Sequence, residues 1–591
     1  MMIRAAALLA AGALMAFTDL EAPAQAQTFY PGDRVSGEHF AGRSPVLATN
    51  GMAATAHPLA TNVAIDVLQA GGNAVDAAIA ANAAIGLMEP TGNGIGGDIF
   101  VLIWDPETRR VYGLNGSGRS PMGLSYDEVI QTVGEDGAIP PFGAMPVSVP
   151  GTVDGWFAMH ERFGSMDMAD ILAPAIAYAE DGFPMPETIG YYWDRNMRIL
   201  AERYENGEFE EFNNARATYL TEDGDAPTVG EVFRNPDLGQ TYRMIAEGGR
   251  DAFYEGEIAR TIDAYMQRIG GWLRYEDFAA HRSEWVNPIS TVYRGHEVWQ
   301  IPPQGQGLAT LQMLAILDGF DLSETGFMTA QTLHLMIEAK RLAFEDRGRF
   351  YADPDFIETP VIELLSSAYT DARRAMIDPD RAMETVAHGD PAQLEDGDTT
   401  YLTVADSSGM MVSLIQSNYR GMGSGLVPDG LGFMFQDRGE SFSLDPDHPN
   451  VYAPDKRPFH TIIPGMVTLN GQGVMSYGLM GGAMQPQGHV QVLSNILDFG
   501  LNVQEAGDAA RWRHTGSTQP TDAVTAEGGL GVVQVESGVP AEVREALEAK
   551  GHVVEDGDGG FGGYQMIYRD PANGVLHGAT EMRKDGAAQG Y

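Results

Sequence analysis

The sequence predicts an α+β protein built as a sandwich of sheets layered by helices. Two observations lead to this prediction. Both halves of the chain mix helix-like with strand-like segments, and the pattern changes at Thr399, after which strands and turns become frequent. A sheet must bury its apolar face against another layer, and helices on the outside satisfy this requirement. No internal repeat is visible in the 591 residues.

The first half of the chain favours helices. Pro58 suits a helix start, Gly71-Gly72 ends that helix, and Asn73 can cap a second, alanine-rich helix over 74–87. Ile99 to Trp104 should form a buried strand. A short strand is also expected over 47–56 and another over 298–302. Further helices are expected over 152–163, 166–180, 258–269, 308–317, 330–343 and 369–376.

The second half begins with a predicted hairpin. Tyr401 to Ala405 and Met410 to Ser417 flank the turn Asp406-Ser407-Ser408-Gly409. Residues 385–398, just before it, are polar, acidic and without periodicity, which indicates a loop suited to cleavage. More strands are expected over 433–436, 462–469, 474–479 and 563–568, and helices over 487–499, 506–511 and 541–550.

Composition excludes several function classes. The 37 basic and 81 acidic residues give a net charge of −44, which disfavours nucleic acid and anionic membranes as partners. The chain has no cysteine, so disulfides, thiol nucleophiles and cysteine-bound metals are excluded.

The N-terminus indicates export. Arg4 precedes an apolar run from Ala5 to Phe17, and Ala24-Gln25-Ala26 supplies a small-residue cleavage site. We therefore expect residues 1–26 to be a signal peptide and the mature chain to begin near Gln27. The run is too short to anchor the protein in a bilayer, so the mature protein should be periplasmic or secreted and carry no membrane anchor.

Common catalytic motifs are missing. The chain contains no H-E-x-x-H, G-x-S-x-G or Walker A sequence. Residues 92–97 match G-x-G-x-x-G, but they follow a helix and open a strand, which inverts the dinucleotide-binding order. We expect a tight turn there and no cofactor. The histidines, including His448 and His460, lack metal-ligand spacing, so no metal site is expected.

Thr399 is a candidate nucleophile only under one condition. A threonine hydroxyl needs a base, and an α-amino group serves when threonine is the first residue of a chain. Such an amino group has a reference pKa of ~7.7–8.0, so a useful fraction is neutral near pH 7–8. By composition and spacing alone, a threonine at a turn–strand junction is more often an ordinary residue at the start of a strand.

Several ordered motifs carry a resemblance. They are Gly71 to Ala78, Gly94 to Asp98, Pro146 to Gly155, Asp398-Thr399-Thr400, Lys456-Arg457-Pro458, Gly481-Gly482 and Arg583 to Ala588. Over residues 45–591 the chain resembles the γ-glutamyltransferase family of N-terminal-nucleophile hydrolases.

The resemblance implies a four-layer αββα sandwich and no cofactor. It implies self-cleavage into a large subunit, residues 27–398, and a small subunit, residues 399–591, which stay together as a heterodimer. Thr399 takes the role of nucleophile, and Ser417 falls where a family threonine supports the nucleophile's amino group. Gly481 and Gly482 would donate hydrogen bonds to an oxyanion.

The pocket residues depart from the family pattern. The arginine that binds the donor's carboxylate aligns with Ser117, and Arg119 two residues later is the substitute we expect. The paired serines are His460 and Thr461, and the asparagine is Tyr419. The glutamine and aspartate that hold the donor's ammonium align with Arg438 and Ser441, with Glu440 next to the latter as a possible replacement.

These departures leave the donor open. A cation in place of ammonium-binding groups favours an acyl group with a carboxylate and no ammonium, as in the branch of glutaryl and cephalosporin acylases. A γ-glutamyl amide such as glutathione is the other donor considered, and a non-catalytic periplasmic binding protein is the alternative from another class. Residues 450–456 form a short loop where lidded members carry an insertion, so hydrolysis should exceed transfer to amines.

Overall fold

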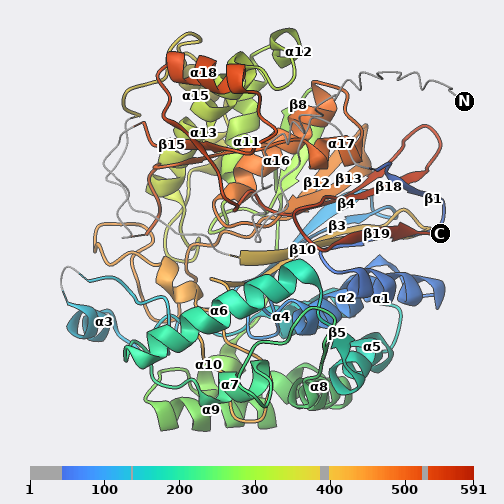
Figure 1. Ribbon diagram of the computed structural model, residues 1–591, viewed down its shortest axis with the longest axis vertical. Helices are drawn as coiled ribbons and strands as arrows, with labels where there is room; N and C mark the ends of the chain where they lie inside the picture. The colour runs from blue at the N-terminus through green and yellow to red at the C-terminus, as the bar shows by residue number, and fades with distance from the viewer. Residues whose placement is uncertain (1–42, 135–136, 387–397, 522–529) are drawn as a thin grey trace, which may run out of the picture.

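Two stacked β-sheets lie across the middle of the molecule, with helices above and below them (Figure 1). This computed structural model describes residues 43–134, 137–386, 398–521 and 530–591. The expected signal peptide and most of the expected cleavage loop lie outside these residues. The layers confirm the predicted αββα sandwich.

The first sheet has the strand order β1-β18-β17-β13-β12-β9-β8. Its strands are β1 (Val46–Ala48), β18 (Leu576–Thr580), β17 (Tyr564–Arg569), β13 (Gln472–Leu479), β12 (Gly465–Leu469), β9 (His296–Gln300) and β8 (Ile289–Tyr293). The second sheet has the order β19-β2-β10-β11-β3-β4-β7. Its strands are β19 (Ala587–Gly590), β2 (Met52–Thr55), β10 (Asp398–Ala405), β11 (Met411–Tyr419), β3 (Asp98–Asp105), β4 (Arg110–Gly116) and β7 (Glu284–Val286).

Strand β3 shows how the layers are specified. Successive side chains of a strand point to opposite faces. Phe100, Leu102 and Trp104 join the apolar layer between the two sheets. Ile99, Val101 and Ile103, on the other face, pack against the helices of the lower layer in Figure 1. Both faces are apolar because both are buried.

Helices form the outer layers. Below the second sheet in Figure 1 are α1 (Pro58–Gln69), α2 (Ala74–Met88), α4 (Thr152–Phe163), α5 (Met168–Asp181), α6 (Glu187–Glu205), α7 (Asn213–Tyr219), α8 (Pro236–Tyr254), α9 (Glu257–Ile269) and α10 (Tyr275–Ala280). Above the first sheet are α11 (Gly307–Leu317), α13 (Ala330–Phe350), α15 (Ser367–Arg374), α16 (Met484–Leu497), α17 (Val503–Asp508) and α18 (Ala541–Ala549). Within the described ranges, no helix combines the length and apolar character that a bilayer crossing requires.

The start of the chain folds as predicted. Helix α1 begins at Pro58, and Asn73 caps α2 through hydrogen bonds from the backbone of Val75 and Asp76. Asp76 completes a capping box by accepting from the backbone of Asn73. Every residue of α2 is buried, which explains its alanine content, since small side chains allow close packing on all faces.

Two element predictions were wrong. Residues 433–436 form no strand, because the N–H of Phe435 bonds to Leu426 and that of Gln436 to Gly96 in neighbouring loops. The helix predicted over 506–511 begins earlier, at Val503, and ends at Asp508. Asn502 and Glu505 form its capping box, and residues 512–515 then form strand β14.

Candidate active site

Thr399 lies at an irregular point of the central hairpin. Strand β10 pairs with β11, and the register shifts between Asp398 and Thr400, which places Thr399 at the shift. Bulges of this kind often re-aim a side chain next to an active site. Thr399 is 1% exposed, and its Oγ1 donates a hydrogen bond to Ser417 Oγ at 3.2 Å. The structure thus brings together two residues that the sequence predicted to work together.

The glycine loop of residues 92–97 packs against this hairpin. A Cβ atom on Gly92 would lie 3.1 Å from the backbone of Thr399, and one on Gly97 would lie 2.4 Å from the carbonyl oxygen of Ser417. These distances confirm the sequence prediction of a turn where backbone approaches backbone. Glycine is required because any side chain would push the loop away from Thr399.

Ser417 connects Thr399 to other residues of the site through hydrogen bonds. Its Oγ also accepts hydrogen bonds from the backbone N–H of Tyr419 at 2.8 Å and from Arg438 Nη2 at 3.3 Å. The guanidinium of Arg438 therefore lies one side chain away from the candidate nucleophile. Tyr419 itself has φ = +78°, a left-handed conformation that is rare for an aromatic residue and that tends to occur at functional sites.

Arg438 is a fully buried cation, at 0% exposure, on the short 3₁₀ helix Arg438–Ser441. Its Nη1 donates to Thr461 Oγ1 at 2.9 Å, and its guanidinium carbon lies 4.1 Å from the centre of the Tyr419 ring. No ion pair of Arg438 with any described residue is present. Burial lowers its pKa to about 10, which still leaves it charged at neutral pH.

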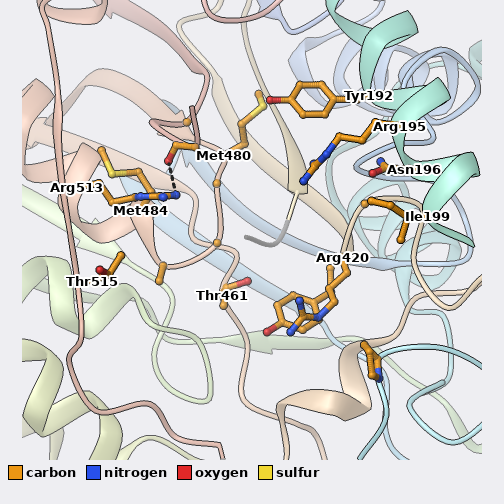
Figure 2. Close-up of a pocket in the computed structure, with 18 of the residues that line it drawn as sticks. Tyr192, Arg195, Asn196, Ile199, Arg420, Thr461, Met480, Met484, Arg513 and Thr515 are labelled. Carbon is orange, nitrogen blue, oxygen red and sulfur yellow. Dashed lines mark hydrogen bonds between the residues drawn. The ribbon is translucent and has the colours of Figure 1, made fainter. Parts of the chain in front are cut away.

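A cavity of about 640 Å³ opens beside these residues (Figure 2). Tyr419, Thr461, Gly481 and Gly482 line it. The N–H groups of Gly481 and Gly482 donate no hydrogen bond within the described residues, and both glycines have positive φ, at 110° and 54°. Free backbone donors at a cavity wall are what an oxyanion requires. Thr399 is not among the lining residues, and it connects to them through Ser417, whose Oγ also accepts from the backbone N–H of the lining residue Tyr419.

Four other predicted residues lie outside the cavity lining. Glu440 forms a two-pronged ion pair with Arg420, at 2.6 Å for the Nη2–Oε1 contact, and Ser441 is buried beside it. His460 Nε2 lies 3.1 Å from Asp98 Oδ2. Burial lowers the pKa of His460 to about 4, so the ring is neutral at pH 7 and this contact is a hydrogen bond to the carboxylate.

Arg119 is the fourth, and the structure holds it in a separate cluster. Its Nη2 lies 2.6 Å from Asp355, and its Nη1 lies 3.4 Å from Asp353. Although burial alone would lower its pKa, the hydrogen bond to Asp355 and the neighbouring carboxylates raise it. Arg119 faces a second cavity of about 300 Å³. The structure does not bring it together with Thr399 and the glycines as the sequence reasoning expected.

Other lining residues were missed from the sequence because no motif marks them. Arg195 and Asn196 come from α6, Arg420 from the end of β11, and Lys340 from α13. Lys340 Nζ lies 3.0 Å from His514 Nδ1 and donates to Ser517 Oγ at 2.9 Å. Burial lowers the pKa of Lys340 well below its usual range. For Lys340 alone, a charged residue at a buried position of a helix was an available signal.

One group outside the cavity has metal-ligand chemistry. His334, Glu338 and His552 present ligand atoms within 4.8 Å of one another. His334 Nδ1 lies 2.8 Å from His552 Nε2, and Glu338 pairs with Arg341 at 2.8 Å and with the N–H of Met383. Because the ligand atoms already bond to protein groups beside an arginine, the arrangement fits a hydrogen-bonded cluster better than a cation site.

Similarity to known proteins shows the family of this chain. The gamma-glutamyltranspeptidase family profile matches residues 60–591. The chain belongs to this family. It is therefore an enzyme of the acyltransferase and amidohydrolase type that includes the glutathione hydrolases, which confirms the resemblance drawn from the motifs.

Named relatives differ in their donors. A glutathione hydrolase-like YwrD proenzyme of Bacillus subtilis is 35% identical over 92% of this chain and 99% of its own. The oxamate amidohydrolase proenzyme of Klebsiella pneumoniae is 35% identical, with the same two coverages. Among solved structures, the cephalosporin acylase of Bacillus halodurans is 43% identical with a TM-score of 0.85, covering 93% of this chain and 97% of its own.

Proposed function

We propose that this protein cuts itself between Asp398 and Thr399 and then cleaves amides through an acyl-enzyme on Thr399. The observation that carries the proposal is the hydrogen bond from Thr399 to Ser417, which also bonds to the cavity-lining Tyr419, together with the two free glycine N–H groups that line the same cavity. The mature protein would be a heterodimer of residues 27–398 and 399–591, periplasmic or secreted after removal of residues 1–26.

Self-cleavage proceeds by an acyl shift. The Thr399 hydroxyl oxygen attacks the carbonyl carbon of Asp398, the C–N bond breaks, and the hydroxyl proton ends on the released nitrogen. Water then attacks the ester, and this frees the Asp398 carboxylate and the Thr399 hydroxyl. We expect Ser417, which already bonds to the Thr399 side chain, to hold the new α-amino group.

Turnover repeats the attack on a substrate amide. The α-amino group takes the hydroxyl proton as the oxygen attacks the substrate carbonyl. Gly481 and Gly482 donate to the tetrahedral oxyanion, and losing one such donor typically costs about 3–4 kcal/mol. The proton passes to the leaving amine as the C–N bond breaks. Water then hydrolyses the acyl ester, or an amine takes the acyl group.

The favoured donor carries a carboxylate on its acyl group and no neighbouring ammonium. Arg438 places a positive charge directly behind Thr461 and Tyr419, and Glu440 is neutralised by Arg420, so the acidic group needed to hold an ammonium is engaged elsewhere. Oxamate, named for one relative, has this chemistry, and another relative is named a cephalosporin acylase. A γ-glutamyl donor remains the alternative, supported by the relatives named glutathione hydrolases.

Two experiments test the proposal in sequence. Wild-type protein should show two chains on a denaturing gel, with the smaller beginning at Thr399, and Thr399→Ala should remain one chain. A wild-type chain that stays intact at pH 7–8 would defeat the proposal in favour of a non-catalytic protein. The processed enzyme is then given glutaryl-p-nitroanilide and γ-glutamyl-p-nitroanilide. Faster release from the glutaryl compound supports the favoured donor, and a preference for γ-glutamyl supports the alternative.

A further inference from the structure

One face of helix α6 forms a wall of the cavity. Tyr192, Arg195, Asn196, Ile199 and Arg203 all line it, and their spacing of three or four residues places them on one side of the helix. In Figure 2, the labelled side chains of α6 face Met480, Met484 and Arg513 across the cavity. The acyl-transfer site at Gly481 and Gly482 belongs to that opposite wall.

The charge of the cavity is opposite in sign to that of the chain. The chain carries −44 overall, but the described lining is mainly basic, with Arg195, Arg203, Arg420, Arg513 and Lys584 against a single acidic residue, Glu202. A cleft lined by one sign of charge concentrates ligands of the other sign. The cavity is therefore suited to an anionic ligand on a surface that otherwise repels anions.

Arg195 and Asn196 lack partners within the described residues. Arg203 pairs with Glu208 and Arg420 with Glu440, whereas no ion pair or hydrogen bond of Arg195 is present in the described part of the chain. Asn196 is 7% exposed, and neither end of its amide bonds to a described residue. Arg195 is exposed, and the amide atoms of Asn196 are not among the fully buried polar atoms of the described residues, so a ligand in the cavity can reach both groups.

The rest of α6 is firmly held. Asp585 accepts hydrogen bonds from the backbone N–H groups of Thr188 and Ile189 at 2.8 and 3.0 Å, in the first turn of the helix. Trp193 Nε1 donates to Tyr219 O at 2.9 Å. The negative charge of Asp585 interacts favourably with the positive end of the helix dipole at this first turn. Arg195 and Asn196 are thus presented by a fixed scaffold.

We propose that Arg195 and Asn196 form a subsite for a carboxylate on the amine part of the substrate, so that the preferred amides release an anionic amine such as an amino acid. The inference rests on the proposed function at Thr399. Arg438 stands behind Thr461 and Tyr419 and serves the acyl side. Arg195 stands across the cavity from the oxyanion glycines, where the leaving amine extends.

The test compares two leaving groups on one acyl group. The processed enzyme is assayed with the better acyl donor of the preceding experiment, as its p-nitroanilide and as its 3-carboxy-4-nitroanilide. The measured quantity is the ratio of kcat/KM for the carboxylated over the neutral anilide. We expect Arg195→Ala to lower this ratio by about tenfold, as for loss of one charge-assisted hydrogen bond, and Arg195→Lys to lower it less. Added NaCl should lower the wild-type ratio.

Arg198→Ala is the matched control. Arg198 lies one turn from Arg195 on the same helix, pairs with Asp194 at 2.6 Å and is absent from the cavity lining. This variant should keep the wild-type ratio. A ratio that Arg195→Ala leaves unchanged overturns the subsite while the anilide activity still supports the proposed function. Failure of the wild-type enzyme to hydrolyse either anilide defeats the proposed function, and the subsite with it.

Discussion

The Oγ atom of Ser417 accepts a hydrogen bond from Arg438 Nη2 at 3.3 Å while it also accepts one from Thr399 at 3.2 Å. A buried cation is thereby coupled to the candidate nucleophile through a single hydroxyl group. The sequence resemblance aligns Arg438 with a glutamine of the family, so we expect this coupling to distinguish the chain from γ-glutamyltransferases that keep the glutamine.

Replacing Ser417 should slow both self-cleavage and turnover. In Ser417→Ala the Thr399 hydroxyl and the later α-amino group lose a positioning partner, and Arg438 loses one as well. We expect kcat to fall by about tenfold to a hundredfold, which corresponds to about 1.4–2.7 kcal/mol. Ser417→Thr keeps the hydroxyl and should retain most of the rate. Gel densitometry measures self-cleavage, and anilide hydrolysis measures kcat. Equal rates in all three proteins would contradict the role of this hydroxyl.

Arg438 should shift the pH dependence of the reaction. A nearby cation disfavours the protonated form of an amine and so lowers its pKa. Removing the charge in Arg438→Met should raise the apparent pKa that limits kcat/KM on the acid side by about one unit, or about 1.4 kcal/mol. Arg438→Lys should keep the wild-type profile. A full pH–rate profile of each processed enzyme provides the measurement, and an unshifted acid limb in Arg438→Met would refute the coupling.

Tyr419 should control donor choice. Its φ of +78° costs on the order of 1–3 kcal/mol for a bulky residue, and asparagine, the family's residue at this position, adopts this backbone more readily. In Tyr419→Asn the relief of this strain should offset part of the stability that is lost with the buried Tyr419 ring. The substitution also adds an amide suited to an ammonium, so the kcat/KM for γ-glutamyl over glutaryl anilide should rise about tenfold. A ratio at or below the wild-type value would exclude this role.

Buried histidines should make the fold sensitive to acid. Burial lowers the pKa of His57 to about 4 and that of His489 to about 3, from an ordinary value of 6.5. Because the folded pKa is depressed, each contributes stability above pH 6.5 that is lost as the pH falls toward the folded pKa. From pH 7 to pH 5 each should remove about 2 kcal/mol of unfolding free energy.

Urea unfolding at the two pH values measures this loss. His489→Gln should reduce the pH-dependent part by about 2 kcal/mol. Identical pH slopes for wild type and His489→Gln would show that the acid sensitivity has another source.

Features of the fold that depend on a few neighbouring residues, such as turns and helix caps, could be predicted from the sequence. The turn at residues 406–409 defines the hairpin that carries Thr399, and Asn73 with Asp76 fixes the start of α2 through a capping box. The glycine loop at 92–97 was recognised as a close approach of backbones because its order excluded a nucleotide site. The layer order came from the family resemblance, since nothing local indicates which sheets stack.

The remaining features depend on contacts between distant residues. Arg119 is two residues from the family's arginine position, but carboxylates at 353 and 355 hold it elsewhere, and no pattern near Arg119 indicates them. Arg195 and Lys340 reach the cavity from helices without motifs. The hydrogen bond from Arg438 to Ser417 forms because the 3₁₀ helix Arg438–Ser441 folds against β11. This contact joins residues that are distant in the sequence, so no local sequence pattern predicts it.

Trapping the acyl-enzyme tests the central claim most directly. The processed enzyme is mixed with excess glutaryl-p-nitroanilide, quenched in acid and analysed by mass spectrometry with peptide mapping. The account predicts that the small subunit gains the mass of one acyl group, located on the peptide that begins at Thr399, and that the adduct disappears as turnover ends. An adduct on another side chain, such as Lys340, or anilide release with no adduct on Thr399, would contradict it.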